Sequence, residues 1–218
     1  RPRPELTLAP PGVPAGVRIR LGEPATAIDT SGRVVHTAQG GYPYDALVLA
    51  TGSRPFVPPV PGTDRPGCFV YRTLDDLEAL RAYARGRRTG TVVGGGLLGL
   101  EAANALRLLG LETSIVEFAP HPMPAQLDPA GGGMLRRHIE ALGIAVHCAT
   151  AVTGIESDGD RLRVRTEGEL ALDTDVVVFA AGVRPRDELA RAAGLPLGSR
   201  GGVLVDPACR TGTGDPIY

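Results

Sequence analysis

The 218-residue sequence contains no lysine, and its formal net charge is −1. Apart from histidine, every basic side chain is an arginine, and the arginines are scattered along the chain. We therefore interpret the missing lysine as a compositional bias of the genome rather than as a functional feature. A nearly neutral chain has no electrostatic attraction to nucleic acid or to an anionic membrane, so we expect neither as a partner.

Cysteine is also scarce, since Cys68, Cys148 and Cys209 lie far apart and form no C-x-x-C pair. Three such thiols cannot hold a four-thiolate iron–sulfur cluster, and they provide no disulfide framework. The default is therefore a reducing cytoplasm. No apolar run is long enough to span a bilayer, and no signal-peptide pattern opens the chain. The four histidines have no ligand-like spacing, so no metal site is predicted.

The most informative stretch begins with an apolar strand, Thr91–Val93, that leads into a turn of the pattern G-x-G-x-x-G. An apolar helix is predicted over Leu97–Leu109, closed by Gly110, and a second strand over Thr113–Val116 ends on Glu117. Strand, glycine turn, helix, strand and acid in this order are typical of a dinucleotide-binding unit. The alternative is a structural loop, which arises easily in a chain with 30 glycines.

Each part of this motif has a physical role. Gly94 allows the tight turn, Gly96 lets a pyrophosphate approach the backbone, and Gly99 lets the helix pack closely. Glu117 is placed to accept both ribose hydroxyls and to repel a 2′-phosphate, which favours NADH over NADPH; only His121 lies near enough in sequence to soften this. The alternative for Glu117 is a solvated strand-end carboxylate. The predicted contacts here are Gly94, Gly95, Gly96, Leu97, Leu98, Gly99, Glu117 and Phe118.

Around this motif the pattern predicts an α/β chain. The proline-rich residues 1–16 are expected to be irregular. Asp128 is a predicted N-cap, and three short segments after residue 151 are expected to form an antiparallel crossover in place of a helix. Helices are predicted over residues 74–85, 97–109 and 129–142. Strands are predicted over residues 16–21, 25–29, 33–37, 46–50, 91–93, 113–116, 144–147, 152–156, 161–166, 169–172 and 175–181.

The chain repeats one pattern internally. Residues 44–55 and residues 174–185 both read as an aspartate, an apolar strand of the kind buried on both faces of a parallel sheet, a small residue, glycine, and then x-Arg-Pro. A match of this quality suggests two related nucleotide-binding units.

These residues resemble the two-dinucleotide-domain flavoproteins of the pyridine nucleotide–disulfide oxidoreductase superfamily. Within it the chain is most similar to the FAD and NAD domains of the assimilatory NAD(P)H nitrite reductase large subunits. The resemblance covers about residues 16–218. It is carried by residues 49–59, 67–73, 94–101, 116–120 and 181–190.

The resemblance implies a Rossmann-like NAD(P)-binding domain inserted into an FAD-binding α/β domain. It implies an irregular tail over 1–16, the first part of an incomplete FAD-binding domain over 17–74, the NAD(P)-binding domain over 75–183, and the return part of the FAD-binding domain over 184–218. The family's FAD glycine motif belongs before Arg1 and its closing flavin contact after Tyr218. We therefore expect a fragment that does not reduce nitrite by itself.

The resemblance also implies individual roles. Glu101 matches a glutamate that lies near the nicotinamide and orients it, the alternative being a solvent-facing helical residue. Ala181, Gly182 and Val183 would contact the nicotinamide side. Thr51, Gly52 and Arg54 would contact FAD in the intact parent.

The expected function is NADH-to-FAD hydride transfer, with electrons passing to a downstream acceptor, either a sirohaem and iron–sulfur region or a small electron-transfer protein. No nucleophile–base pair suggests other chemistry. The alternatives are a rubredoxin or ferredoxin reductase-like enzyme and an NAD-binding module without turnover. Homo-oligomerisation stays open.

Overall fold

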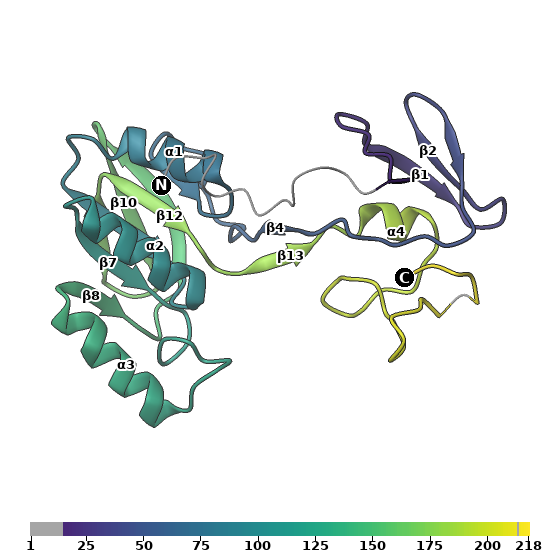
Figure 1. The fold of residues 1–218 in the computed structure, drawn as a ribbon. Helices are drawn as coiled ribbons and strands as arrows, with labels where there is room; N and C mark the ends of the chain where they lie inside the picture. Colours follow the sequence, from purple (N-terminus) through teal and green to yellow (C-terminus); the bar gives the residue numbers. More distant parts are fainter. Residues whose placement is uncertain (1–14, 213) are drawn as a thin grey trace. The chain divides into compact units, whose positions relative to one another are not determined.

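The structure, a computed structural model, describes residues 15–212 and 214–218. The predicted irregular tail, apart from residues 15 and 16, lies outside these ranges. The described part of the chain divides into two compact units, one made of its residues up to Thr51 and from Arg186 onward and the other of Gly52–Pro185. The division into FAD-binding and NAD(P)-binding domains expected from the resemblance stays a prediction. Figure 1 shows the elements of each unit.

The Gly52–Pro185 unit is built on a parallel five-stranded sheet in the order β5-β12-β6-β7-β8. The predicted antiparallel crossover is present as a second sheet, β11-β10-β9. The strands of these two sheets are β5 (Cys68–Val70), β6 (Thr89–Val93), β7 (Glu112–Val116), β8 (Ile144–His147), β9 (Val152–Asp158), β10 (Arg161–Thr166), β11 (Ala171–Thr174) and β12 (Val176–Phe179).

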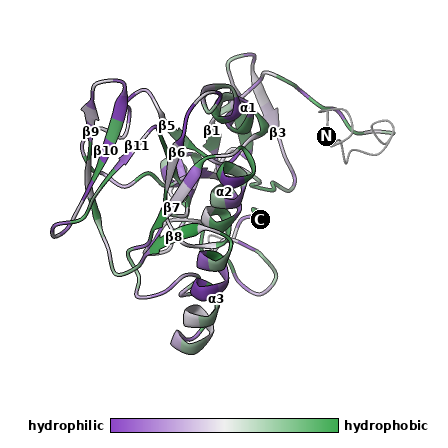
Figure 2. Cartoon of the chain, turned by 90° about the vertical axis from the view of Figure 1, so that its left-hand side faces the viewer, coloured by the Kyte–Doolittle hydropathy of each residue, from purple (hydrophilic) through white to green (hydrophobic). Residues whose placement is uncertain are grey.

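Three helices complete this unit: α1 (Leu74–Tyr83), α2 (Leu97–Leu108) and α3 (Pro129–Ala141). Figure 2 shows them on one side of the parallel sheet, with β9, β10 and β11 on the other. The predicted N-cap is confirmed, because the Asp128 side chain accepts the Gly131 N–H at 2.7 Å. The helix follows at once with Pro129 in its first turn, so the glycines at 131–133 do not disrupt its start.

The parallel sheet is buried on both faces, as its unbroken apolar strands predict. Side chains alternate along β12, so Val176 and Val178 pack with the helices while Val177 and Phe179 pack with the antiparallel sheet. All four residues are at most 2% exposed. The predicted strand over 175–181 is therefore confirmed in its central part.

Asp175 ties the starts of β12 and β6 together. One carboxylate oxygen accepts the N–H groups of Arg88 and Thr89 at 2.8 and 3.0 Å and the Thr89 hydroxyl at 3.1 Å. Arg161 donates to the other oxygen at 3.2 Å. Burial alone would raise the pKa of this carboxyl, but these donors outweigh it, and the pKa lies below its ordinary value.

The other unit holds an antiparallel meander of β1 (Ala25–Asp29), β2 (Val34–Thr37) and β3 (Gly41–Pro43), together with α4 (Glu188–Ala192). The strands predicted over 25–29 and 33–37 are confirmed. The strand predicted over 16–21 is wrong, since these residues are exposed and pair with no strand in the described part of the chain. A segment of alternating apolar and polar residues that pairs with no other strand gains neither buried apolar surface nor inter-strand hydrogen bonds.

The buried strand predicted over 46–50 is also wrong. Leu47 forms a single parallel bridge with Ile217, and Val48 is 71% exposed. Leu47 and Leu49 pack against the small core around Ile217, while the alternate residues of the segment are exposed. The pattern matches β12, but one bridge replaces the two neighbouring strands that bury β12.

The two x-Arg-Pro ends of the internal repeat meet. β4 (Ser53–Pro55) and β13 (Val183–Pro185) pair antiparallel, with Arg54 opposite Arg184. This ribbon lies within the Gly52–Pro185 unit. Among the described residues, no helix is long and apolar enough to cross a bilayer.

We predict that Asp175→Ala lowers the free energy of unfolding by about 1–2 kcal/mol at pH 7, because it leaves the partly buried N–H groups of Arg88 and Thr89 without their acceptor. Asp45→Ala, at the matching repeat position, removes an exposed carboxylate and should change stability by less than about 0.5 kcal/mol. Urea unfolding measures both.

The folded pKa of Asp175 is depressed, so its contribution is present above the unfolded pKa of about 3.9 and is lost as pH falls through the folded value. The gap between wild type and Asp175→Ala should therefore shrink below about pH 4. An equal loss for Asp45→Ala, or a pH-independent gap, would contradict this account.

Candidate functional site

The glycine turn between β6 and α2 has the geometry its sequence predicts. Gly94 has a φ of +117°, and a Cβ added there would lie 2.5 Å from the Ala180 carbonyl oxygen. A Cβ on Gly99 would overlap the carbonyl oxygen of Gly94. The turn therefore accepts no side chain at either position, and the start of α2 lies directly against the end of β6.

Gly96 is different, because a Cβ added there would meet no heavy atom within 4 Å. It is the N-cap of α2, and no side chain caps the helix at this residue. The open space lies beside a helix N-terminus, whose first-turn N–H groups and dipole favour an anion. The geometry fits the approach of a phosphate group to the backbone.

Glu117 follows β7 and is held by backbone donors on both sides. Its carboxylate accepts the N–H of Gly95 from the glycine turn and, at 2.7 Å, the N–H of Ala119. Its own N–H donates to the His147 carbonyl at 2.8 Å. These bonds fix the half-buried carboxylate beside the turn, so it is more than a freely solvated strand end.

The loop after Glu117 is attached to the same turn. Met123, with a φ of +53°, donates its N–H to the Gly95 carbonyl oxygen at 3.0 Å. His121 turns toward α3, where an added Cβ at Gly132 would overlap its ring. This loop brings residues 124–126 to the glycine turn.

A cleft of about 740 Å³ opens at the carboxyl ends of β6, β7 and β12. This is the edge at which open α/β sheets bind ligands. Its described lining residues are largely apolar, and Glu117 is their one ionisable member. They are Phe56, Pro58, Val93, Gly94, Gly96, Leu97, Leu98, Val116, Glu117, Phe118, Pro124, Ala125, Gln126, Thr150, Ala151, Val152, Ala180, Ala181, Gly182 and Val183.

The sheet order sets the sequence of groups along this cleft. β6 lies between β7 and β12, so the glycine turn after β6 separates Glu117, after β7, from residues 180–183, after β12. On the β12 side, Gly182 has a φ of +112° and its carbonyl oxygen accepts the N–H of Phe56 at 2.9 Å. The Arg184 guanidinium lies over the Phe56 ring, 4.2 Å from its centroid.

Most of the predicted contact residues are brought together here. Nine line the cleft: Gly94, Gly96, Leu97, Leu98, Glu117, Phe118, Ala181, Gly182 and Val183. Gly95 and Gly99 are buried in the turn beneath them.

Besides Gly95 and Gly99, four predicted site residues do not line this cleft. Arg54 lies on β4 opposite Arg184, and Gly52 precedes that strand. Thr51 belongs to the other unit, where its hydroxyl donates to the Arg186 carbonyl at 2.7 Å. Glu101 is exposed on α2.

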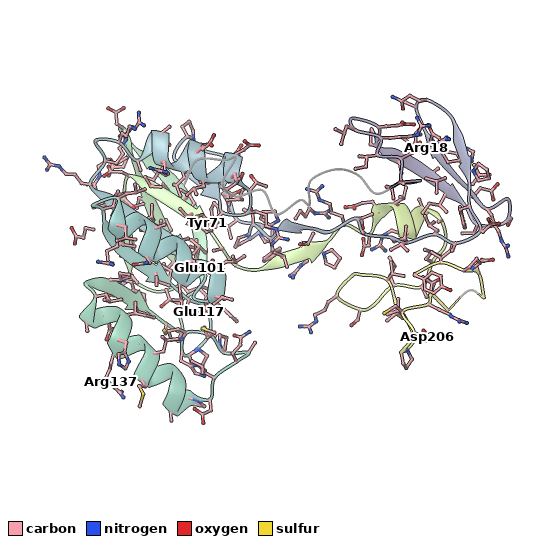
Figure 3. The ribbon with its side chains drawn as sticks, viewed as in Figure 1. Arg18, Tyr71, Glu101, Glu117, Arg137 and Asp206 are labelled. Carbon is pink, nitrogen blue, oxygen red and sulfur yellow. The ribbon has the colours of Figure 1, made fainter. Side chains whose placement is uncertain are left out.

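Glu101 nevertheless has a neighbour that the sequence did not indicate. Burial raises the pKa of the Tyr71 phenol above its ordinary value, and the negative charge of Glu101 raises it further. Figure 3 labels Tyr71, Glu101 and Glu117 along the same side of this unit.

Several lining residues were not predicted from the sequence, among them Phe56, Pro124, Thr150 and Val152. Thr150–Val152 follow β8, and the rule that ligands bind beyond the carboxyl ends of parallel strands could have found them. Phe56 had no such signal, because it reaches the cleft through the pairing of β4 with the distant β13.

Within the described residues, no group of three or more histidine, cysteine or acidic side chains is arranged to hold a metal ion. Burial raises the pKa of the Cys68 thiol to about 11 and also raises that of Cys148. Both thiols are therefore protonated at neutral pH, when a thiol is a weak nucleophile.

Comparisons with known proteins agree with this geometry. A family model described as pyridine nucleotide-disulphide oxidoreductase matches residues 10–218. The nitrite reductase [NAD(P)H] large subunit of Klebsiella oxytoca is 53% identical over 203 residues, covering 93% of this chain and 21% of that protein. The nitrite reductase (NADH) large subunit of Escherichia coli (strain K12) is 45% identical over 206 residues, covering 93% and 24%.

Among solved structures, a ferredoxin reductase from Rhodopseudomonas palustris superposes with a TM-score of 0.83 at 35% identity, covering 89% of this chain and 48% of that chain. The predicted α/β class with a Rossmann-like parallel sheet is confirmed. The chain thus spans 21% and 24% of the two curated relatives described above.

We predict that Gly99→Ala lowers the free energy of unfolding by about 2 kcal/mol, because its methyl group must displace the Gly94 carbonyl. Gly133→Ala on α3, where a Cβ meets only the tip of Arg137 at 3.9 Å, should be neutral or stabilising. Thermal and urea unfolding compare the two. A neutral Gly99→Ala would refute the close packing of this turn.

Proposed function

Because the chain belongs to the pyridine nucleotide-disulphide oxidoreductase family, we propose that its Gly52–Pro185 unit binds NAD(P)H in the cleft described above. The observation that carries this proposal is the open space at Gly96, beside the N-terminus of α2 and at the carboxyl edge of a parallel sheet. A pyrophosphate there would meet backbone N–H groups rather than a side chain.

The order of groups along the cleft supports one orientation of the dinucleotide. With the pyrophosphate at Gly96, the adenosine lies on the β7 side, where Glu117 accepts ribose hydroxyls and Phe118 lines the cleft. The nicotinamide lies on the β12 side, beside Ala181–Val183. Glu101 is proposed to lie near this end as well. Its negative charge contributes to raising the pKa of the Tyr71 phenol.

The proposed activity belongs to a longer protein. When bound, the reduced nicotinamide supplies a hydride that an FAD of the longer protein accepts, and the electrons pass on to a further acceptor. The residues of this chain hold the dinucleotide, orient it and keep the nicotinamide end of the cleft largely apolar. Thr51, Gly52 and Arg54 are proposed FAD contacts of the intact protein.

The parent protein proposed is an NAD(P)H-dependent flavoprotein of the nitrite reductase large-subunit type, on the strength of the relatives from Klebsiella oxytoca and Escherichia coli. A cytoplasmic location and an acceptor in a sirohaem and iron–sulfur region accompany this proposal. The likeness to a ferredoxin reductase supports a second candidate, a small electron-transfer protein as acceptor.

NADH is the proposed preferred cofactor. A carboxylate fixed by Gly95 and Ala119 accepts ribose hydroxyls and repels a 2′-phosphate. None of the described lining residues is basic, and His121 packs on α3, so nothing there offsets that repulsion.

We predict that Gly96→Ala weakens NADH binding by at least about tenfold, because the methyl group occupies the space of the pyrophosphate. Its effect on stability should not exceed about 1 kcal/mol, the usual effect of an N-cap change. NADH fluorescence titration measures binding, and the absence of tryptophan from the chain simplifies the emission. Gly133→Ala is the matched control, and equal affinities of the two variants would refute the proposed pyrophosphate position.

We also predict that the wild type binds NADH more tightly than NADPH, and that Glu117→Gln reduces the ratio of the two affinities by about tenfold through loss of its charge. Glu112→Gln, at the exposed opposite end of β7, should leave the ratio unchanged. Titration with each reduced cofactor provides the measurement. Tighter binding of NADPH by the wild type would overturn the proposed preference.

A further inference from the structure

A cation–π pair stands at the β12 end of the cleft and has no part in the proposed cofactor contacts. The Arg184 guanidinium lies 4.2 Å from the centroid of the Phe56 ring. Phe56 and Val183 line the cleft, whereas Arg184 is not among its described lining residues. The guanidinium also donates to the Val183 carbonyl at 3.3 Å, so an apolar part of the cleft wall has a positive charge stacked on it and bonded to its backbone.

The ribbon of β4 and β13 holds this pair in place. Arg184 lies opposite Arg54 in the antiparallel register, so both side chains leave the same face of the ribbon. Like charges opposite each other repel, which favours an arrangement in which Arg184 finds a separate partner. Phe56 is held by its N–H bond to Gly182, and its ring supplies that partner.

The charge behind the ring acts on the nicotinamide according to its redox state. The reduced ring is neutral, whereas the oxidised ring carries one positive charge. A cation close to the binding position leaves the neutral form unaffected and repels the charged one. Among the described lining residues, the one opposing charge is on Glu117, across the glycine turn at the other end of the cleft. Glu101, proposed to lie near the nicotinamide, carries the second opposing charge, but it is exposed on α2 and does not line the cleft.

We propose that Phe56 and Arg184 form an electrostatic wall that makes the cleft prefer NADH over NAD⁺. Phe56 supplies the surface, and Arg184 acts through it as a positioning and charge-bearing residue. The wall weakens binding of the oxidised product and so favours its release after the hydride has left. This inference rests on the proposed placement of the nicotinamide beside Ala181–Val183.

The test measures the dissociation constants of NADH and NAD⁺ for the whole chain, the first by NADH fluorescence and the second by competition. Arg184→Gln should lower the ratio of the NAD⁺ constant to the NADH constant by about threefold, as expected for one charge acting over about 8 Å in a partly solvated site. Arg184→Lys keeps the charge and should keep the ratio.

Arg87→Gln is the matched control, because Arg87 makes the same kind of contact with Tyr83, at 4.9 Å from the ring centroid and outside the cleft. It removes the same net charge, and the ratio should stay at the wild-type value. Circular dichroism and thermal unfolding check that each variant is folded; Arg184 is exposed, so its substitutions should be tolerated.

The outcomes separate the two proposals. If the wild type binds neither NADH nor NAD⁺, the proposed function fails. If the wild type binds both and Arg184→Gln leaves the ratio of the two dissociation constants unchanged, the electrostatic wall is overturned while the proposed function stands. The same holds if Arg184→Gln weakens the binding of NADH and NAD⁺ equally. An equal change of the ratio in Arg87→Gln would also overturn it, since net charge alone would then account for the effect.

Discussion

The backbone contact between the start of α2 and the end of β6 is the constraint on which the rest of the Gly52–Pro185 unit depends. Gly99 lies against the Gly94 carbonyl, and Gly94 in turn lies against the Ala180 carbonyl. These contacts bring the ends of β6 and β12 and the N-terminus of α2 to one place. The packing that stabilises the unit therefore also creates the cleft, because side chains are excluded where the three backbones meet.

The parts of the fold that sequence could predict are those with local causes. Asp128 caps α3 because its side chain reaches an N–H three residues on, and this pattern can be read without knowing the rest of the structure. Residues 46–50 and 176–179 have nearly the same apolar pattern, yet only the second run is buried. The difference comes from the strands that pair with each run, and pairing partners far along the chain leave no mark in the run itself.

The residues of the candidate site also separate into those with a local cause in the sequence and those whose position depends on the fold. The glycine turn and Glu117 were predicted because the motif that defines them is continuous in sequence. Phe56 was missed because the pairing of β4 with β13 brings it from a distant segment, whereas Thr150 follows β8 at the carboxyl edge of the sheet, where the rule for open α/β sheets could have indicated it. Arg54 is expected by resemblance to contact FAD in the intact protein; it lies on β4 and does not line this cleft, and its role stays a prediction. The internal repeat matched the two Arg-Pro segments without indicating that they pair with each other.

In the loop between Glu117 and α3, the Met123 N–H donates to the Gly95 carbonyl of the glycine turn, and the Ala119 N–H donates to the Glu117 carboxylate. An insertion there would shift the carboxylate and the turn together, whereas the hairpin between β9 and β10 projects from exposed residues such as Asp158 and Gly159. Over evolutionary time the first loop is therefore constrained in length and the second is free to vary. A fusion or an inserted domain would be accommodated at the hairpin and rejected at the loop.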